Sequence, residues 1–327
     1  MRKNQTLVVG VDLGGTSMKA IIADRRNRVL ASNRKRTDVR AKPKPLISEI
    51  ANLIERAAAD AGVKVPALAA VGIGAPGAVD VERGVVIAAP NLGWRNVPLG
   101  AELKSRLRVP VVVENDVNIG VVGEHALGAG NQVSHLLGVF VGTGIGGGII
   151  CGGELYGGGH GWAGEIGHMV LLAGGPVCGC GNRGCAEALA SRTAMERDMR
   201  DAVKGGRPSA VIRIMKERKK DRMTSSVIEA ALGKKDAVMK EIMKRAEFYL
   251  GILVANLVNV LDPERVVIGG GIAARLGEDF VGPIRRTATE YFLHAGAVKR
   301  VKIVKGILGD KAGTLGAVVL ARKRLHL

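Results

Sequence analysis

Three cysteines lie within eight residues of one another, at Cys178, Cys180 and Cys185, and glycines separate them. Thiolate sulfurs at this spacing, on a chain that can turn sharply, suit tetrahedral Zn²⁺. The nearest histidine to supply a fourth ligand is His168, ten residues before Cys178. A closed set of three cysteines and one histidine leaves no open position for water, so such a zinc ion would be structural. The alternative is three free thiols on a loop.

Two carboxylates flank this cysteine cluster. Glu165 stands three residues before His168, close enough for both side chains to reach one site, and Glu187 follows the cluster directly. A metal that fixes these loops would preorganise two carboxylates and an imidazole for a polyhydroxylated ligand. The alternative is that both glutamates are ordinary surface residues. The fourth cysteine, Cys151, is expected to be a buried apolar filler.

Two glycine-rich turns could bind phosphate. The first is the segment Asp-Leu-Gly-Gly-Thr-Ser-Met-Lys at positions 12–19, and the second is Gly-Thr-Gly at positions 142–144. Glycines let backbone N–H groups approach an anion, and Thr16 adds a hydroxyl. Asp12 at a strand end could hold Mg²⁺, through water because Mg²⁺ keeps much of its hydration shell. Either turn alone could be an ordinary hairpin, but the pair in duplicated positions favours a bound nucleotide.

Asp116 stands where a predicted strand gives way to a helix. One interpretation is a helix N-cap. The other is a general base at the carboxyl end of a strand, where open α/β sheets bind ligands. In phosphoryl transfer such an aspartate orients the attacking hydroxyl and accepts its proton.

Two better-known phosphate motifs are excluded. Positions 72–77 and 142–147 both match G-x-G-x-x-G, but strand-like sequence follows each, whereas a dinucleotide fingerprint opens a helix. No G-x-x-x-x-G-K-[ST] segment occurs in the chain.

The elements that must position these residues follow an α/β pattern that occurs twice. Strands 7–11 and 18–23 should pair as an antiparallel hairpin, because the turn between them is too short for a crossover. Offset by 130 positions, Val9 and Val11 fall on Val139 and Val141, again before a glycine-rich turn. Further strands are expected at 67–73, 85–89, 111–113, 136–141, from 149 onward, 265–268 and 303–308. Helices are expected at 46–61, 99–107, 116–125, 186–200, within 229–261 and at 313–325.

This duplication predicts two similar α/β domains facing one another. We expect a smaller domain over 1–115, completed by a C-terminal helix at about 309–327, and a larger one over 116–308 that carries the cysteine cluster. No linker or low-complexity tract separates the two halves.

The composition is that of an ordinary globular protein. The chain has 327 residues, 47% hydrophobic and 24% charged, which argues against disorder. No stretch reaches the roughly 20 apolar residues of a membrane helix, and no apolar block precedes Asp12, so we expect neither a membrane span nor a leader peptide. A cytoplasmic location follows. The net charge of +18 lies in runs without interleaved aromatic residues, so no nucleic acid is expected as a partner.

Taken in order, five motifs resemble one family. They are the DLGGT segment from Asp12, Glu-Asn-Asp ending at Asp116, Gly-Thr-Gly at 142–144, Gly-Glu-Ile-Gly-His ending at His168, and the cysteine cluster continuing into Glu187 and Ser191. This set is similar to the ROK (repressor, open reading frame, kinase) sugar kinases, most of all to their bacterial-type glucokinases. The match covers nearly the whole chain, and the cysteine cluster is its most specific part.

The resemblance implies an actin-like ATPase fold (ribonuclease H-like) with two similar α/β domains and a cleft between them that holds sugar and ATP. It implies that Asp116 is the base for the sugar 6-hydroxyl. His168 would use one ring nitrogen on zinc and the other towards the sugar. The other implied sugar contacts are Asn91, Asn115, Asp116 itself, Glu165 and Glu187. The implied ATP and phosphate contacts are Asp12, Gly14, Gly15, Thr16, Lys19, Gly142, Thr143, Gly144, Gly269, Gly270 and Gly271.

The predicted function is therefore ATP- and Mg²⁺-dependent phosphorylation of a hexose, glucose first, by an enzyme with a structural Zn²⁺. The resemblance suggests a homodimer or homotetramer. Alternatives are a kinase for mannose, N-acetylglucosamine, N-acetylmannosamine, allose or fructose, a sugar-sensing regulator without activity, or a zinc-stabilised binding module. The family's repressors carry a helix-turn-helix before the first strand, for which Asp12 leaves no room here. The high positive charge leaves open an anionic donor such as polyphosphate.

Overall fold

The computed structural model describes residues 7–327, except for the side chain at position 295. Positions 1–6, part of the segment inspected above for a leader peptide, lie outside the described residues. The chain forms two compact units. The first extends to Gln132 and includes 154–163 and 310–327, and the second comprises 133–153 and 164–309. Residues 116–132, which we expected in the larger domain, lie in the first unit because the helix they form packs against the C-terminal helix.

The first unit is built on a five-stranded sheet with the order β3-β2-β1-β4-β8. β1 and β2 are antiparallel, as the short turn predicted, whereas β1, β4 and β8 are parallel. The carboxyl ends of these three parallel strands therefore meet at one edge. The strands are β1 (Val8–Leu13), β2 (Ser17–Ala23), β3 (Val29–Arg36), β4 (Ala70–Ala75) and β8 (Val111–Asn115), and a smaller sheet contains β5 (Ala78–Asp80), β6 (Val85–Ala89) and β7 (Trp94–Val97).

The second unit repeats this topology. Its sheet has the order β11-β10-β9-β12-β13, with β9 and β10 antiparallel and β9, β12 and β13 parallel. The predicted internal duplication is thus confirmed, and both β1 and β9 are central strands with fully buried valines. The strands are β9 (Leu136–Val141), β10 (Ile145–Cys151), β11 (Glu154–Leu155), β12 (Arg265–Gly269) and β13 (Lys302–Lys305).

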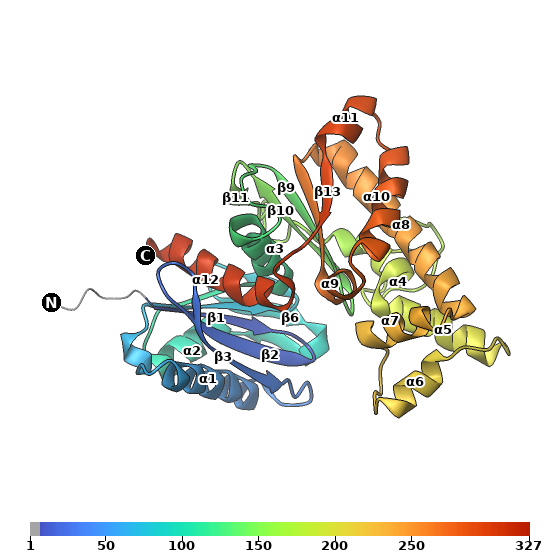
Figure 1. The fold of residues 1–327 in the computed structure, drawn as a ribbon. Coiled ribbons are helices and arrows are strands. Elements are labelled where there is room, and N and C mark those ends of the chain that lie inside the picture. The colour runs from blue at the N-terminus through green and yellow to red at the C-terminus, as the bar shows by residue number, and fades with distance from the viewer. Residues whose placement is uncertain (1–6) are drawn as a thin grey trace. The chain divides into compact units, whose positions relative to one another are not determined.

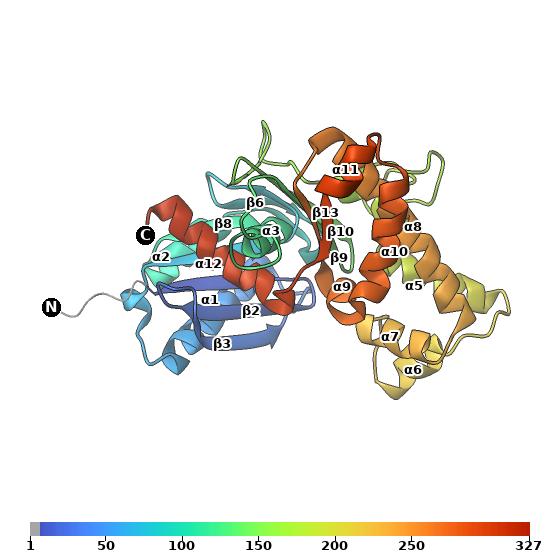
Figure 2. The ribbon, with the colours of Figure 1, turned by 45° about the horizontal axis from the view of Figure 1, so that its top comes forward.

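Helices cover both sheets. In the first unit α1 and α12 lie on opposite faces of the sheet (Figure 1), and in the second α8 and α10 run side by side (Figure 2). The first unit contains α1 (Pro43–Asp60), α2 (Leu99–Leu107), α3 (Asp116–Leu127), α12 (Ala312–Leu325) and the short turns η1 (Val65–Ala67) and η2 (Pro90–Leu92). The other helical elements are η3 (Ile166–His168), α4 (Ala186–Ala190), α5 (Arg192–Lys204), α6 (Val211–Glu217), α7 (Ser225–Gly233), α8 (Ala237–Leu261), α9 (Gly270–Leu276), α10 (Glu278–Glu290), α11 (Ala295–Arg300) and η4 (Gly309–Lys311). Within residues 7–327, none of these helices has the length and apolar character needed to cross a bilayer.

The structure contains elements that were not expected, among them β3, β7 and α9 to α11, and it differs from the sequence-based expectations in three further details. The helix expected at 186–200 is broken at Ser191, whose hydroxyl caps α5 by accepting a hydrogen bond from the Ala194 amide at 3.1 Å. The return strand of the second hairpin begins at Ile145, four residues earlier than expected. Cys151 is exposed, so its interpretation as a buried filler is wrong, because it ends β10 where a two-glycine turn begins.

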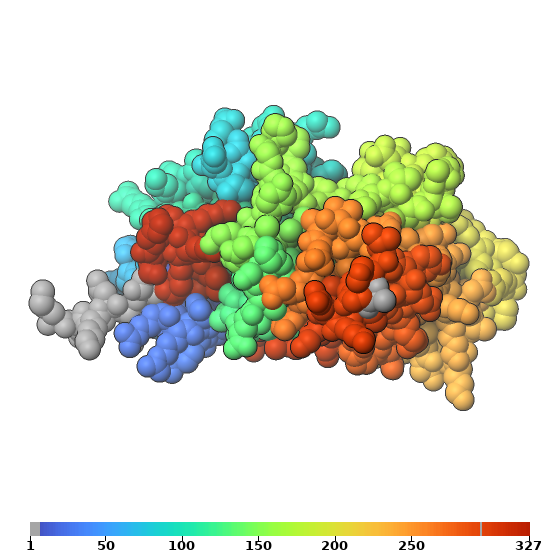
Figure 3. Space-filling model, turned by 90° about the horizontal axis from the view of Figure 1, so that it is seen from above, coloured from blue at the N-terminus to red at the C-terminus, as the bar shows by residue number. Residues whose placement is uncertain are grey.

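The C-terminal helix α12 packs on the first sheet at backbone contact distance. A β-carbon at Gly10 of β1 would lie 2.0 Å from the Thr314 carbonyl oxygen, and one at Gly72 of β4 would lie 2.0 Å from that of Ala317. Only glycine at these strand positions allows the helix to approach so closely. Figure 3 shows that one side of α12 (dark red) remains at the surface beside the N-terminal strands (blue).

Helices α12 and α3 meet in the same way. A β-carbon at Gly316 of α12 would lie 1.6 Å from the Ile119 carbonyl oxygen, and one at Gly123 of α3 would lie 2.3 Å from that of Ala312. Glycines on both helices thus bring the two backbones together. The last residues of the chain thereby hold β1, β4 and α3 as one body.

We expect Gly316→Ala to lower the free energy of unfolding by at least about 2 kcal/mol, because the added methyl overlaps backbone that cannot shift without separating α3 from α12. The control is Gly233→Ala at the end of α7, where a β-carbon would meet nothing within 4 Å. That change should be neutral or stabilise by up to about 1 kcal/mol. Urea unfolding of both variants checks this, and equal effects would refute the packing argument.

Candidate functional site

The first glycine turn, residues 14–16, joins β1 to β2. The Gly14 amide donates to the Ser17 carbonyl at 3.2 Å. Thr37 holds the turn from the far end of β3: its hydroxyl donates to the Gly14 carbonyl at 2.7 Å, and its amide donates to that of Thr16 at 3.1 Å. Gly15 and Thr16 are exposed. The turn is fixed through its carbonyl groups while its tip faces solvent.

Asp12 lies one residue before the end of β1 and is half-buried. A β-carbon at Gly313 would lie 2.6 Å from Asp12 Oδ2, so the carboxylate sits against the first turn of α12. Burial raises the pKa of Asp12 to about 6, with Asp310 adding to the rise and Lys19 and Arg34 opposing it. Lys19 Nζ donates to the Asp310 carbonyl at 3.4 Å. A carboxylate this poorly solvated is suited to a cation.

Asn115, and not Asp116, is the N-cap of α3. Its Oδ1 accepts hydrogen bonds from the amides of Val117 at 2.8 Å and Asn118 at 3.1 Å, and its Nδ2 donates to the Gly77 carbonyl at 3.0 Å. The N-cap interpretation of Asp116 is therefore wrong. Asp116 is the first helical residue, so its carboxylate is not required for capping. Both the oxygen and the nitrogen of the Asn115 side-chain amide therefore already form hydrogen bonds within the protein.

Asp12 lies near the end of β1 and Asp116 directly follows β8, and these two parallel strands flank β4 on either side. Gly74 of β4 pairs with Asp12, and a β-carbon there would lie 3.1 Å from the Asp116 Cα. Both aspartates therefore lie beside Gly74 at this edge of the sheet. Asn91 in η2 is exposed, and its Cβ lies 3.9 Å from where a β-carbon of Gly15 would be. The first unit thus gathers all its expected site residues at one edge of its sheet.

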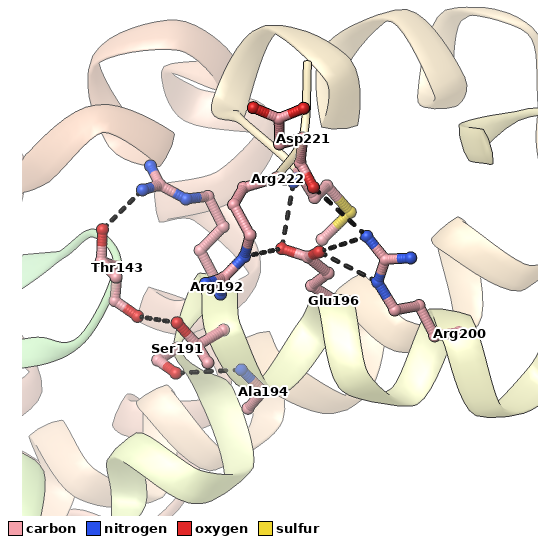
Figure 4. A network of polar contacts seen from close by, with 10 residues as sticks. Thr143, Ser191, Arg192, Ala194, Glu196, Arg200, Asp221 and Arg222 are labelled. Atoms are coloured by element: carbon pink, nitrogen blue, oxygen red, sulfur yellow. Dashed lines mark hydrogen bonds and ion pairs between the residues drawn. The ribbon is translucent and has the colours of Figure 1, made fainter. Parts of the chain in front are cut away.

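The second glycine turn, residues 142–144, joins β9 to β10 and rests on the start of α5 (Figure 4). The Gly142 carbonyl accepts from the Arg192 amide at 3.1 Å, and the Thr143 carbonyl accepts from the Thr193 hydroxyl at 2.8 Å. The Arg192 side chain adds a bond from Nη2 to Thr143 Oγ1 at 2.6 Å. Like the first turn, this one is held through its carbonyl groups.

Glu187 links this turn to the cysteine cluster. Its Oε2 accepts from the Ile145 amide at 3.0 Å, and its Oε1 accepts from Cys178 Sγ at 3.8 Å. A β-carbon at Gly144 would lie 2.2 Å from Glu187 Oε2, so the glycine makes room for the carboxylate. Both oxygens of this expected sugar ligand are therefore engaged with the protein.

The glycine run at the end of β12 lies against the end of β9. A β-carbon at Gly269 would lie 2.8 Å from the Phe140 ring, and one at Gly270, whose φ is +87°, would lie 2.4 Å from the Val141 carbonyl oxygen. Gly271 follows within α9. The run therefore lies beside the second glycine turn, as expected for residues that serve the same ligand.

The cysteine cluster converges as the zinc interpretation requires. The ligand atoms of His168, Cys178, Cys180 and Cys185 all lie within 4.8 Å of one another. Cys180 Sγ and Cys185 Sγ are 3.8 Å apart, and Cys178 Sγ is 3.7 Å from His168 Nδ1. Tetrahedral Zn²⁺ with Zn–S bonds of about 2.3 Å spaces its sulfurs about 3.8 Å apart. The donor set and its spacing fit zinc.

The electrostatics of the cluster also favour a cation. Burial raises the pKa of Cys178 to about 12 and raises that of Cys185, whereas a hydrogen bond from the Asn182 amide lowers the pKa of Cys180. The protein alone thus stabilises one thiolate of the three, and a bound divalent ion would stabilise the others. His168 directs Nδ1 to the cluster and Nε2 towards Glu165 Oε2, 3.9 Å away.

Two residues of this region escaped the sequence analysis. Arg192 and Thr193 hold the second glycine turn, yet they were assigned to the interior of one long helix. Ser191, a good N-cap residue, was the available signal that a second helix begins there.

Comparison with known proteins assigns the chain to a family. Residues 8–324 match the ROK family model. The chain belongs to the ROK family. It is 36% identical to a glucokinase of Thermotoga maritima over 97% of this chain and 98% of that protein. It is 34% identical to a putative xylose repressor of a Caldicellulosiruptor species over 98% of this chain and 79% of that protein. Its fold resembles that of a Streptomyces griseus ROK glucokinase solved with glucose and AMPPNP (TM-score 0.84, 33% identity, 97% and 99% of the chains covered).

These similarities confirm the expected fold class, the actin-like ATPase fold of ROK glucokinases with its mixed α/β sheets. The family assignment made from the motifs is confirmed as well.

We expect Asp12→Asn to stabilise the fold at neutral pH. Because the carboxyl pKa is about 6 in the folded protein and 3.8 in its ordinary environment, stability is lost as pH rises through that window. Asparagine cannot ionise, so the variant should exceed the wild type by on the order of 1–3 kcal/mol at pH 7.5, and the difference should shrink towards pH 4.5. Thermal unfolding without magnesium or nucleotide measures this, with Asp201→Asn on α5 as an exposed control. A difference independent of pH would contradict the assignment.

Proposed function

We propose that this ROK protein is a sugar kinase that transfers the γ-phosphoryl group of ATP to the 6-hydroxyl of a hexose, with glucose as the first candidate. The observation that carries this proposal is the placement of Asp12 and Asp116 at one edge of the first sheet, beside the glycine turn. The glucokinase relatives from Thermotoga maritima and Streptomyces griseus, aligned over nearly the whole chain, support it independently.

Asp116 is proposed to be the general base. At the first position of α3 it stands at the carboxyl end of β8, and Asn115 already satisfies the helix cap. Its carboxylate would accept the proton of the 6-hydroxyl and orient the oxygen for in-line attack.

Asp12 and Lys19 are proposed to serve the phosphate groups together with Gly14, Gly15 and Thr16. Mg²⁺ bound with ATP would supply positive charge against the charge that develops on the transferred group. Asp12 fits such an ion because its carboxylate is half-buried at a strand end beside the exposed tip of the turn. On the second unit, residues 142–144 and 269–271 are proposed to contact the nucleotide.

The sugar contacts proposed are Asn91, Asn115, Asp116, Glu165, His168 and Glu187. Glu165 is exposed and lies next to the outward-facing Nε2 of His168, so this pair is open to hydroxyl groups. Asn115 and Glu187 already hydrogen-bond within the protein. They would bind a sugar while also fixing the segments that carry the other ligands.

Zn²⁺ is proposed to bind His168, Cys178, Cys180 and Cys185. Because Glu187 follows Cys185 by two residues and accepts from the Ile145 amide, the metal would also help to fix the second glycine turn. We retain a cytoplasmic location and a homodimeric or homotetrameric state as predictions.

A sugar-responsive regulator is the second candidate, because the putative xylose repressor aligns with 98% of this chain at 34% identity. Sugar binding without phosphorylation would favour it.

We predict that Asp116→Asn and Asp116→Ala lower kcat by about 10²- to 10⁴-fold, because the base is removed, while the sugar still binds. The assay follows ADP release with Mg-ATP over a panel of hexoses and N-acetylhexosamines, with calorimetry for sugar binding. Asp201→Asn is the control and should keep full activity. Wild-type turnover in a folded Asp116 variant would refute the assignment of Asp116 as the base. Turnover on a sugar other than glucose would change the proposed substrate but leave the proposed mechanism unchanged.

We also predict one equivalent of zinc per chain by elemental analysis. Chelation, or Cys180→Ser, should remove it and lower the melting temperature by on the order of 5–10 °C. Cys151→Ser, which alters the exposed cysteine outside the cluster, is the matched control and should change neither value. A fully folded protein that holds no zinc would overturn this part of the proposal.

A further inference from the structure

Two carboxylates lie near the second glycine turn: Glu187, which accepts from the Ile145 amide, and Glu196. Three arginines, at positions 192, 200 and 222, carry more charge than these two carboxylates balance (Figure 4). Glu196 of α5 is only 4% exposed. Its Oε1 accepts from Arg200 at 2.7 and 3.0 Å, and its Oε2 accepts from Arg222 at 2.9 Å and from the Met223 amide at 3.0 Å. Although burial disfavours its charge, Arg222 and Arg200 hold the pKa of Glu196 below its usual value. One ionised carboxylate is thus saturated by two arginines.

Arg192 is the third arginine of this group, and it adds a charge that Glu196 has no oxygen left to bind. Its side chain is half-buried, and its hydrogen bond joins Nη2 to the Thr143 hydroxyl at 2.6 Å. Across residues 7–327, no carboxylate forms an ion pair with it. Burial lowers the pKa of Arg192, and the nearby Arg222 lowers it further. A guanidinium still keeps its proton at neutral pH, so the charge remains.

The turn itself supplies donors beside this charge. Its carbonyl groups at Gly142 and Thr143 are taken up by Arg192 and Thr193, as described above. Within the described part of the chain, the amides of Thr143 and Gly144 donate to no protein acceptor. Two backbone amides and a guanidinium at one exposed turn form an arrangement that binds oxyanions.

We propose that Arg192 binds the phosphate chain of the phosphoryl donor at the second glycine turn, and that its affinity grows with the number of phosphate groups. This inference rests on the proposed kinase function. One guanidinium nitrogen orients Thr143 and the remaining N–H groups face the anion's oxygens, which suit the planar fork of arginine. Arg222 stands behind it and strengthens the local positive potential.

The Arg192 side chain is not what keeps the turn folded. The Ser191 hydroxyl caps α5, the Thr193 hydroxyl and amide hold the Thr143 carbonyl, and the Arg192 backbone amide holds that of Gly142. All of these contacts survive a change of the Arg192 side chain. Replacing it should therefore alter ligand binding more than stability.

The test compares Arg192→Ala, Arg192→Gln and Arg192→Lys by calorimetry with Mg-ATP, Mg-ADP, AMP and tripolyphosphate, without sugar. Glutamine keeps an N–H donor for Thr143 but removes the charge, and lysine keeps a charge without the fork. Arg207→Ala is the matched control, since it removes one charge of the same unit from an exposed pair with Glu241.

We expect Arg192→Ala and Arg192→Gln to weaken ATP binding by about 10- to 100-fold, ADP less and AMP hardly at all. The binding of tripolyphosphate should weaken by the same factor as that of ATP. Arg192→Lys should recover part of the lost affinity, and Arg207→Ala should bind all four ligands as the wild type does. The KM for the sugar should stay unchanged. Any one of three results for Arg192→Ala would overturn the inference: an equal loss of affinity for ATP and AMP, an unchanged affinity for tripolyphosphate, or an affinity for ATP equal to that of the wild type.

The two proposals fail separately. A wild type that binds ATP through Arg192 but phosphorylates no sugar would refute the kinase function and support this inference. Sugar phosphorylation with a KM for ATP unchanged in Arg192→Ala would refute only the role of Arg192.

Discussion

The close packing of α12 is the constraint on which the first unit depends. The last helix of the chain meets β1 and β4 through Gly10 and Gly72, and meets α3 through Gly123 and Gly316. These contacts hold the strand that carries Asp12 and the helix that begins with Asp116 as one body. The candidate site of this unit is thus positioned by residues some 300 positions apart in sequence, and backbone contact leaves little freedom for it to deform.

The second unit uses the same strand order but secures its turn differently. Here the cysteine cluster, Glu187 and the start of α5 converge on residues 142–144. Glu187, two residues after Cys185, holds the Ile145 amide at the end of the turn. Ser191 ends one helix and starts the next, so that Arg192 and Thr193 face the turn. A structural zinc at the cluster would therefore act on the chemistry indirectly, by restricting the loops that carry the ligands.

Membership in the ROK family leaves function to be argued from the site, because the relatives include both glucokinases and xylose repressors. In this chain two features favour a kinase: Asp116, which is not the helix cap, and a poorly solvated Asp12 beside the first glycine turn. The surplus positive charge at Arg192 is consistent with an anionic phosphoryl donor. It accounts locally for a small part of the net charge of +18.

The sequence by itself determined the hairpins, the duplicated α/β pattern, which cysteines and histidine come together in the cluster, and the family. Hydrophobic alternation, glycine spacing and cysteine spacing are local signals. It did not reveal that Asn115 rather than Asp116 caps α3, because both residue types cap helices and only the backbone geometry chooses between them. It also missed the break at Ser191 and hence Arg192, since helical periodicity continues across it. Only the tertiary structure decided which glycines admit α12, that Cys151 is exposed, and that Arg200 and Arg222 saturate the buried Glu196 while Arg192 bonds the second glycine turn. Each of these depends on contacts between segments that are remote in the chain.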